Sequence, residues 1–220
     1  MLRLLFEKKG NAIWISHLDL MRLFQRAFKR AGLLLKHTQG YNPRPSVSIA
    51  LPLSVGVESG CELLDFEIEN TEEISCEKMK ELLNQSLTEG VRVLDVYDNG
   101  KKYRDLAFLQ CKISLIYDNG VPDGAATAIE GLFRQEQIIL PKKTKNGLQD
   151  QDIIPMIKKF NVDQAGEKSL IIDALICCQN PTLNPAQIVL AINTLAPEFT
   201  PDFNKCSRVE IFDQNNFVFR

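Results

Sequence analysis

The sequence predicts an α+β protein made of two tandem ferredoxin-like domains, each with the element order βαββαβ. A chain of 220 residues with 45% hydrophobic and 25% charged residues is long enough for two compact globular domains. Stretches in which apolar residues fall on every second position, as in strands, are interleaved with stretches in which they recur every three or four positions, as in helices. A turn-rich break, Asp98-Asn99-Gly100-Lys101-Lys102, separates two such series.

The first predicted domain spans residues 1–98. Residues 2–6 are expected to form its first strand. A helix is expected over residues 17–31, because the Ser16 hydroxyl can cap free amides at its start and Gly32 can end it in a left-handed conformation. Two strands, a helix and a last strand follow, at 47–51, at 64–68, between Ser75 and Gly90, and at 91–96. This order most simply forms a sandwich with both helices on one face of an antiparallel sheet.

The second predicted domain spans residues 104–215 and repeats this plan with an insertion around residues 142–166. The insertion is expected to hold a short helix near residues 153–160. The elements expected outside it are a strand at 109–115, a helix from Pro122, strands at 137–140 and 169–178, a helix from Asn184 and a strand at 209–212.

Charge is distributed unevenly along the chain, although the net charge is only −2. Residues 1–60 carry nine basic and three acidic residues, whereas the remaining residues carry seventeen basic and twenty-five acidic ones. An anion-binding surface is therefore expected in the amino-terminal third. The alternative is that these charges form only a solvated helix face.

The first helix concentrates this positive charge on one side. Arg22, Arg26, Lys29 and Arg30 are offset by 0, 4, 7 and 8 positions, which places them on the helix face opposite the apolar stripe. Like charges stacked in this way repel one another, and a bound polyanion would remove that cost. The stripe is interpreted as a phosphate-binding face, with a plainly solvated face as the alternative.

The loop after this helix, residues 36–45, combines stiffness with groups that recognise ligands. Pro43 and Pro45 restrict the residues before them to extended conformations, and Gly40 permits a turn that other residues would not. Stiff loops on a rigid sheet commonly hold recognition side chains. The candidate RNA-binding residues here are two cations, an aromatic ring and two amides, namely Lys36, Arg44, Tyr41, Gln39 and Asn42. The alternative is a structural crossover whose tyrosine packs on the core.

Histidines and cysteines are the remaining candidates for chemistry. His37 could act as an acid or base on an RNA ribose, whereas His17 is expected to be a helix-start residue. The six cysteines are expected to stay reduced, and they lack the spacing of a zinc or iron–sulfur site. The glycines form no phosphate-binding motif. We therefore expect no metal, no cofactor and no catalytic activity of the chain on its own.

Membrane insertion and secretion are not expected from the sequence. No apolar run reaches the roughly 18 residues that span a bilayer. The amino end meets an acidic residue, Glu7, too early for a secretory segment. A cytoplasmic protein is expected.

Four stretches of the first domain carry a resemblance to a known family: 16–22, 26–32, 39–45 and 51–59. In them the sequence resembles the radical SAM-linked (radical S-adenosylmethionine-associated) proteins of unknown function. These occur as separate chains or as the carboxyl-terminal part of radical SAM proteins, and are often encoded near a ribonuclease and ribosomal proteins. The resemblance is dense over residues 2–67, and a second, weaker motif comprises residues 143–147 and 152–155. That family often has tyrosine where His37 stands and histidine where Arg44 stands.

This resemblance implies a partner. The chain has no cysteine triad for an iron–sulfur cluster, so radical chemistry would reside in a radical SAM protein acting in trans. The leading hypothesis is an accessory module that binds tRNA or rRNA and presents a nucleotide to that enzyme. The alternatives are a protein-interaction adaptor that does not contact RNA, and a metal-independent ribonuclease. RNA on the sheet face not covered by helices is not expected, because Arg3, Glu7, Asp65 and Glu67 are predicted to line it in place of exposed aromatic pairs. That face is expected to meet the second domain.

Overall fold

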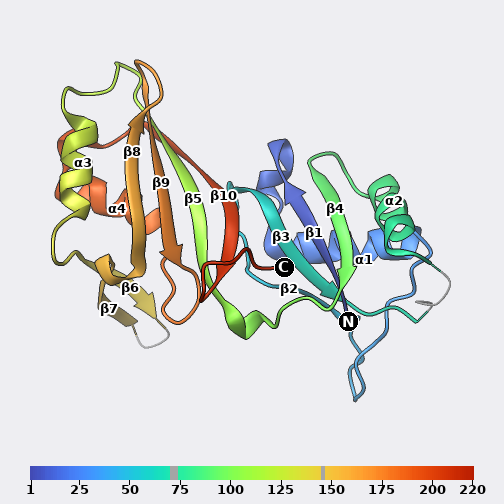
Figure 1. The fold of residues 1–220 in the computed structure, drawn as a ribbon. Coiled ribbons are helices and arrows are strands. Elements are labelled where there is room, and N and C mark those ends of the chain that lie inside the picture. The colour runs from blue at the N-terminus through green and yellow to red at the C-terminus, as the bar shows by residue number, and fades with distance from the viewer. Residues whose placement is uncertain (70–73, 145–146) are drawn as a thin grey trace. The chain divides into compact units, whose positions relative to one another are not determined.

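The structure is a computed structural model that describes residues 1–69, 74–144 and 147–220. The chain divides into two units, Met1–Asp105 with Phe219–Arg220, and Leu106–Val218 (Figure 1). The described residues contain antiparallel strands and four α-helices, which confirms the predicted α+β class. Among these residues, no helix is both long enough and apolar enough to cross a membrane.

The first unit contains the predicted elements in the predicted order. In chain order they are β1 (Leu2–Lys8), the 3-10 helix η1 (Gly10–Trp14), α1 (His17–Arg30), β2 (Val47–Ile49), β3 (Glu58–Phe66), α2 (Cys76–Ser86), β4 (Val91–Asp98) and the 3-10 helix η2 (Tyr103–Asp105). The strands lie in the order β4-β1-β3, with β2 paired to β3, and these pairs are antiparallel.

The apolar stripe of α1 packs on this sheet. The Ser16 hydroxyl accepts a hydrogen bond from the Asp19 amide at 3.2 Å, which confirms the predicted cap. Phe24 and Phe28 are buried, and their ring centroids lie 4.8 Å from those of Phe6 and Phe66, respectively. Ring pairs at this separation add to the gain from burying apolar area. The predicted assignment of the two faces of α1 is therefore confirmed.

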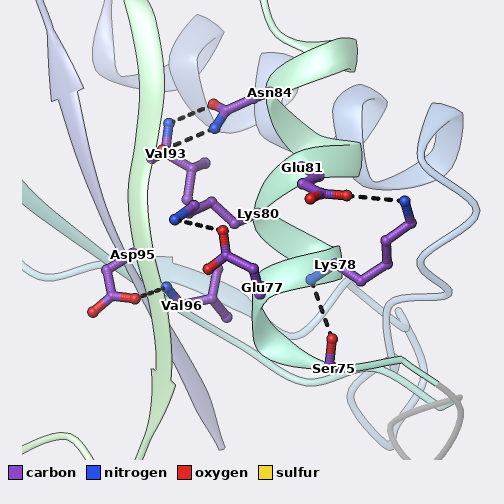
Figure 2. A network of polar contacts seen from close by, with 9 residues as sticks. All are labelled: Ser75, Glu77, Lys78, Lys80, Glu81, Asn84, Val93, Asp95 and Val96. Atoms are coloured by element: carbon purple, nitrogen blue, oxygen red, sulfur yellow. Dashed lines mark hydrogen bonds and ion pairs between the residues drawn. The ribbon is translucent and has the colours of Figure 1, made fainter.

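Helix α2 covers the edge strand β4. The Asn84 side chain accepts a hydrogen bond from the Val93 amide at 2.8 Å and donates one to the Val93 carbonyl at 2.9 Å, as Figure 2 shows. Backbone groups on the outer side of an edge strand have no neighbouring strand to bond. Asn84 satisfies two of these groups at Val93 and thereby fixes α2 against β4.

The other face of the sheet carries the polar residues predicted for it. Arg3 and Asp65 are 3% and 8% exposed. Arg3 Nε and Nη2 donate hydrogen bonds to the two Asp65 carboxylate oxygens at 2.6 and 3.0 Å. Glu7 and Glu67 are only half-buried. The central pair of this polar face is therefore buried as an ion pair.

Residues distant in sequence account for this burial. The Arg3 guanidinium lies 4.6 Å from the ring centroid of Tyr103 and 5.5 Å from that of Phe219. Burial raises the pKa of the Tyr103 hydroxyl, so this ring stays neutral beside the cation. A Cβ on Gly100 would lie 2.7 Å from the guanidinium carbon, so only glycine fits there without displacement. The Lys101 amide also bonds to the carbonyl of Arg220 at 2.7 Å, which holds the carboxyl end on this unit.

The second unit has the same succession of helices and main strands, with an added hairpin. Its elements are β5 (Leu106–Ile116), α3 (Ala125–Phe133), β6 (Ile139–Thr144), β7 (Gly147–Asp152), the 3-10 helix η3 (Ile154–Met156), β8 (Ile157–Gln164), β9 (Ser169–Cys177), α4 (Ala186–Leu195), the 3-10 helix η4 (Pro197–Phe199) and β10 (Phe203–Asp213). The sheet order is β10-β5-β9-β8, and its pairs are antiparallel. β6 and β7 form a separate hairpin.

The short helix predicted near residues 153–160 is only partly present. Residues 154–156 form the 3-10 helix η3, whereas residues 157–160 belong to β8, which pairs with β9. Ile157 and Phe160 are three residues apart and mimic a helical stripe, but Phe160 stacks on Phe133 of α3 at a centroid distance of 4.3 Å. Residues 157–164, predicted to lie in the insertion 142–166, are therefore part of the main sheet. Residues 145 and 146 of the weaker family motif lie outside the described residues.

We expect the Arg3–Asp65 pair to be essential to the stability of the first unit. Asp65→Asn leaves a buried guanidinium without its counterion and should lower the free energy of unfolding by about 3–5 kcal/mol. The double variant Arg3→Met/Asp65→Leu removes both charges and should lose less than Asp65→Asn alone. Urea denaturation of the full chain measures both, and equal losses would contradict the prediction.

A second stability prediction concerns the faces of α1. Phe24→Ala or Phe28→Ala creates a cavity in the core and should cost about 3–5 kcal/mol. Arg26→Ala, on the exposed face of the same helix, should change the free energy of unfolding by no more than about 0.5 kcal/mol. Thermal and urea unfolding test this contrast, and similar costs at positions 24 and 26 would refute the packing described here.

Candidate nucleic-acid interface

The four basic residues of α1 are exposed, as predicted, but they line two different hollows. Arg22, Arg26 and Arg30 border a hollow of about 380 Å³, which we call the arginine hollow. Its other lining residues are Ile15, Asp19 and Leu23. Lys29 instead borders a second hollow of about 430 Å³ together with His37. The single phosphate-binding stripe expected from helical spacing is thus divided.

The three arginines of the hollow have different partners. Arg22 Nη1 lies 2.9 Å from a carboxylate oxygen of Asp19. Arg30 donates a hydrogen bond to the carbonyl of Ser86 at the end of α2. Arg26, between them, has no hydrogen bond or ion pair to any residue that the structure describes, and only its longer-range attraction to Asp19 offsets its charge. Its charge is the one most available to an incoming anion.

Asp19 moderates the positive potential at one end of the hollow. Its carboxylate accepts a hydrogen bond from the Ser16 hydroxyl at 2.7 Å, in addition to its contact with Arg22. The Ser16 bond and then the Arg22 bond hold the pKa of Asp19 below its ordinary value of 3.8. Asp19 is therefore ionised at neutral pH and competes with any anion for Arg22.

The second hollow is amphipathic. Lys29, His37 and Glu69 border it, and its remaining lining residues are Gln25, Leu33, Leu34, Leu35 and Pro45. Leu34 is more than half exposed, so the hollow offers apolar surface next to groups of both charge signs. It lies at the start of the predicted recognition loop.

The loop of residues 36–45 projects from the first unit as the blue loop at the bottom of Figure 1. At its base, the Lys36 amide bonds to the carbonyl of Glu67 at 2.8 Å, and the Ser46 amide bonds to the carbonyl of Lys36 at 2.7 Å. Nearer the tip, the amide of Thr38 bonds to the carbonyl of Arg44 at 2.8 Å. The Tyr41 side chain is fully exposed, so the alternative in which it packs on the core is wrong.

The other predicted loop residues share this exposure. The side chains of Lys36, Gln39, Asn42 and Arg44 are all exposed, as is His37. The structure thus gathers two cations, two amides and a ring on one projecting segment. Among the described residues, His37 has no hydrogen bond or ion pair, and no group of three or more potential metal ligands occurs.

The six cysteines, all within the described part of the chain, form no disulfide, and Cys61, Cys111, Cys177 and Cys178 are buried. Burial raises the pKa of the Cys178 thiol to about 12 and that of Cys206 to about 11. These two thiols are therefore protonated near neutral pH, and a thiol reacts far more slowly than a thiolate.

Two exposed residues that are neighbours in sequence of Ile15 and Asp19, which line the arginine hollow, were not identified from the sequence. Trp14, the last residue of η1, is 65% exposed, and Leu18, on the first turn of α1, is 66% exposed. Leu18 is four residues before Arg22 and so lies on the basic face, where an apolar residue is unexpected. An apolar residue on the basic face, four residues after the single tryptophan, is the sequence signal that could have indicated Trp14 and Leu18.

Comparison with known proteins places the chain in a family. A family model described as an uncharacterized protein conserved in bacteria (DUF2344) matches residues 1–185. The chain belongs to this family. The matched part of this DUF2344 chain includes α1, the arginine hollow and the projecting loop. No curated protein matches the sequence.

Solved structures give a likeness in fold. The DUF2344 chain is similar to a chain in the crystal structure of a Cbf5-Nop10-Gar1 complex, with a TM-score of 0.52 and 10% identity over 96% of this chain and 48% of that one. It thus spans about half of the length of that solved chain. A further match is an unknown protein from Galdieria sulphuraria, with a TM-score of 0.26 and 11% identity over 94% of this chain and 97% of that one.

The contacts of Asp19 generate a prediction about its titration. Ser16→Ala removes the first contributor to its lowered pKa, so the pKa of Asp19 should rise toward 3.8. Arg22→Gln should raise it as well. NMR titration of the carboxyl resonance measures both shifts. An unchanged pKa in Ser16→Ala would show that the hydroxyl does not stabilise the carboxylate.

Proposed function

We propose that the protein is an RNA-binding accessory module, for tRNA or rRNA, that works with a radical SAM modification enzyme supplied by another chain. The observation that carries the proposal is the arginine hollow with Arg26 unpaired among the described residues. Arg22, Arg26 and Arg30 follow one another at intervals of four residues, or about 6 Å along the helix axis. This spacing of the arginines along α1 is comparable to the distance between successive phosphorus atoms of one RNA strand.

The projecting loop supplies a second kind of contact. Lys36 and Arg44 can pair with phosphates, the Tyr41 ring can stack on a base, and Gln39 and Asn42 can bond to base edges. In this proposal the arginine hollow positions the RNA backbone, whereas the loop contacts bases. His37 is a donor in the loop rather than a catalytic group.

The proposed partner is supported by the sequence, and the finer description of the fold by the strand orders. The radical SAM partner rests on the sequence resemblance over residues 2–67. We also propose that both units are ferredoxin-like. The antiparallel orders β4-β1-β3, with β2 at β3, and β10-β5-β9-β8 support this description, because each follows the positions 4-1-3-2 of a βαββαβ unit.

Salt dependence tests the phosphate contacts. Binding of cellular tRNA should weaken with salt, and Arg26→Gln should reduce the log-log slope by about 0.7–0.9. Arg22→Gln should reduce it less, because Asp19 already compensates that charge, and Asp19→Asn should strengthen binding. Lys78→Gln, at an exposed lysine of α2 paired with Glu81, is the matched control and should leave the slope unchanged. Slopes insensitive to Arg26 would refute the phosphate contact.

Tyr41 tests the base contact. Tyr41→Ala should lose about 1–3 kcal/mol of binding free energy at an unchanged salt slope, because stacking releases no counterions. Tyr41→Phe should retain most of the affinity. Fluorescence anisotropy with labelled RNA measures both. Binding of RNA only at the nonspecific level, even with the partner enzyme present, would favour the adaptor alternative, and shortening of the RNA in EDTA would favour the ribonuclease.

A further inference from the structure

Trp14 precedes, in the sequence, the first residue that lines the arginine hollow. It is the last residue of η1, and the next residue, Ile15, lines the hollow. Its side chain is 65% exposed. Large aromatic side chains gain strongly from burial, so a tryptophan left in water one residue before the lining of a cationic hollow suggests a ligand that covers it.

Hydrogen bonds hold η1 from several sides. The carbonyl of Ile13 accepts one from the Gly56 amide at 2.9 Å and one from the buried Lys8 Nζ at 3.0 Å. The amide of Lys9 bonds to the carbonyl of Gly90 at 2.8 Å. A Cβ on Gly90 would lie 2.8 Å from the Cβ of Ala12, so the two backbones are in close contact. The backbone of η1 is thus fixed before any ligand arrives, which lowers the entropic cost of binding.

Gly56 borders the Trp14 ring. Its φ of +83° requires a residue without a side chain, and a Cβ built there would lie 3.5 Å from Cζ3 of the indole. The six-membered part of the ring therefore rests near glycine backbone, while most of the side chain remains open to solvent. Leu18 and Val55, the residue before Gly56, are also more than half exposed.

We propose that an unpaired nucleobase of the bound RNA stacks on Trp14 while the adjoining phosphates lie along Arg22, Arg26 and Arg30. This inference rests on the proposed RNA-binding function. Charge complementarity selects the occupant: the hollow that begins at Ile15, the residue after Trp14, carries three guanidinium groups and one carboxylate, so a ligand that covers both the hollow and the ring is anionic and aromatic. Stacking on an aromatic side chain is available to every base, so the site takes single-stranded RNA with little sequence preference.

The single tryptophan makes this site directly observable, since all tryptophan emission comes from Trp14. Titration with an eight-nucleotide single-stranded RNA should quench the emission at least twofold. An abasic oligonucleotide of equal charge should bind with similar salt dependence but leave the emission nearly unchanged. An abasic strand that quenches as strongly as the RNA would overturn the stacking.

Variants of Trp14 give an independent measurement. Trp14→Ala should weaken RNA binding about five- to hundredfold at an unchanged salt slope, and Trp14→Phe, which keeps a ring, should recover much of the loss. Phe217→Ala removes an equally exposed aromatic side chain, 66% exposed, from the second unit and should not weaken binding. Trp14→Phe serves as the test if Trp14→Ala unfolds.

The outcomes separate this inference from the proposed function. RNA binding that depends on Arg26 but neither quenches Trp14 nor responds to its substitution would overturn the stacking and leave the RNA-binding function standing. RNA that does not bind at all would overturn both. Quenching by an acidic peptide in place of RNA would also overturn the stacking, and would assign the ring to a protein partner.

Discussion

The pairing of β1 with β3 is the constraint on which the first unit depends, and Arg3 opposite Asp65 fixes its register. A slip of one residue would turn both charges toward the helices and the neighbouring apolar side chains away from them. In the observed register Leu4 lies opposite Leu64, and Phe6 and Phe66 project toward α1, where they meet Phe24 and Phe28. The buried ion pair therefore also determines which side of α1 faces outward.

On the outward side of α1, the positive charges of three arginines repel one another, and neighbouring groups offset part of that repulsion. Guanidinium groups four residues apart on a helix repel one another. Asp19 compensates one end of the row, and the carbonyl of Ser86 engages Arg30 at the other. Such compensation keeps the helix stable without ligand but leaves Arg26, in the middle of the row, with only the longer-range attraction of Asp19 and without a hydrogen bond or ion pair to the residues that the structure describes. A polyanion gains most at that position.

Local patterns in the sequence predict what depends on local structure. The Ser16 cap, the two faces of α1 and the projecting loop follow from helical spacing and from proline and glycine chemistry over short stretches. The burial of Arg3 could not be predicted in this way, because Tyr103 and Phe219, which cover it, are about 100 and 216 positions further along the chain. β8 was missed because Ile157 and Phe160 fit a helix as well as a strand. The sequence of α1 alone also could not show that Lys29 borders a different hollow from the three arginines, because that hollow is lined in part by Pro45 and Glu69, which lie outside α1.

The two aromatic side chains of the candidate interface differ in how they are held. Trp14 ends the 3-10 helix η1, whose backbone is held by contacts with Lys8, Gly56 and Gly90. Tyr41 lies in a projecting loop, beyond the backbone hydrogen bond between Thr38 and Arg44. Binding to a ring on a held backbone orders little of the backbone, whereas binding to a ring on a projecting loop orders more of it at a greater entropic cost. In the proposed function, the arginine hollow and Trp14 would therefore supply most of the affinity. The loop would discriminate among bases, since only a base that bonds well to Gln39 or Asn42 offsets the cost of ordering it.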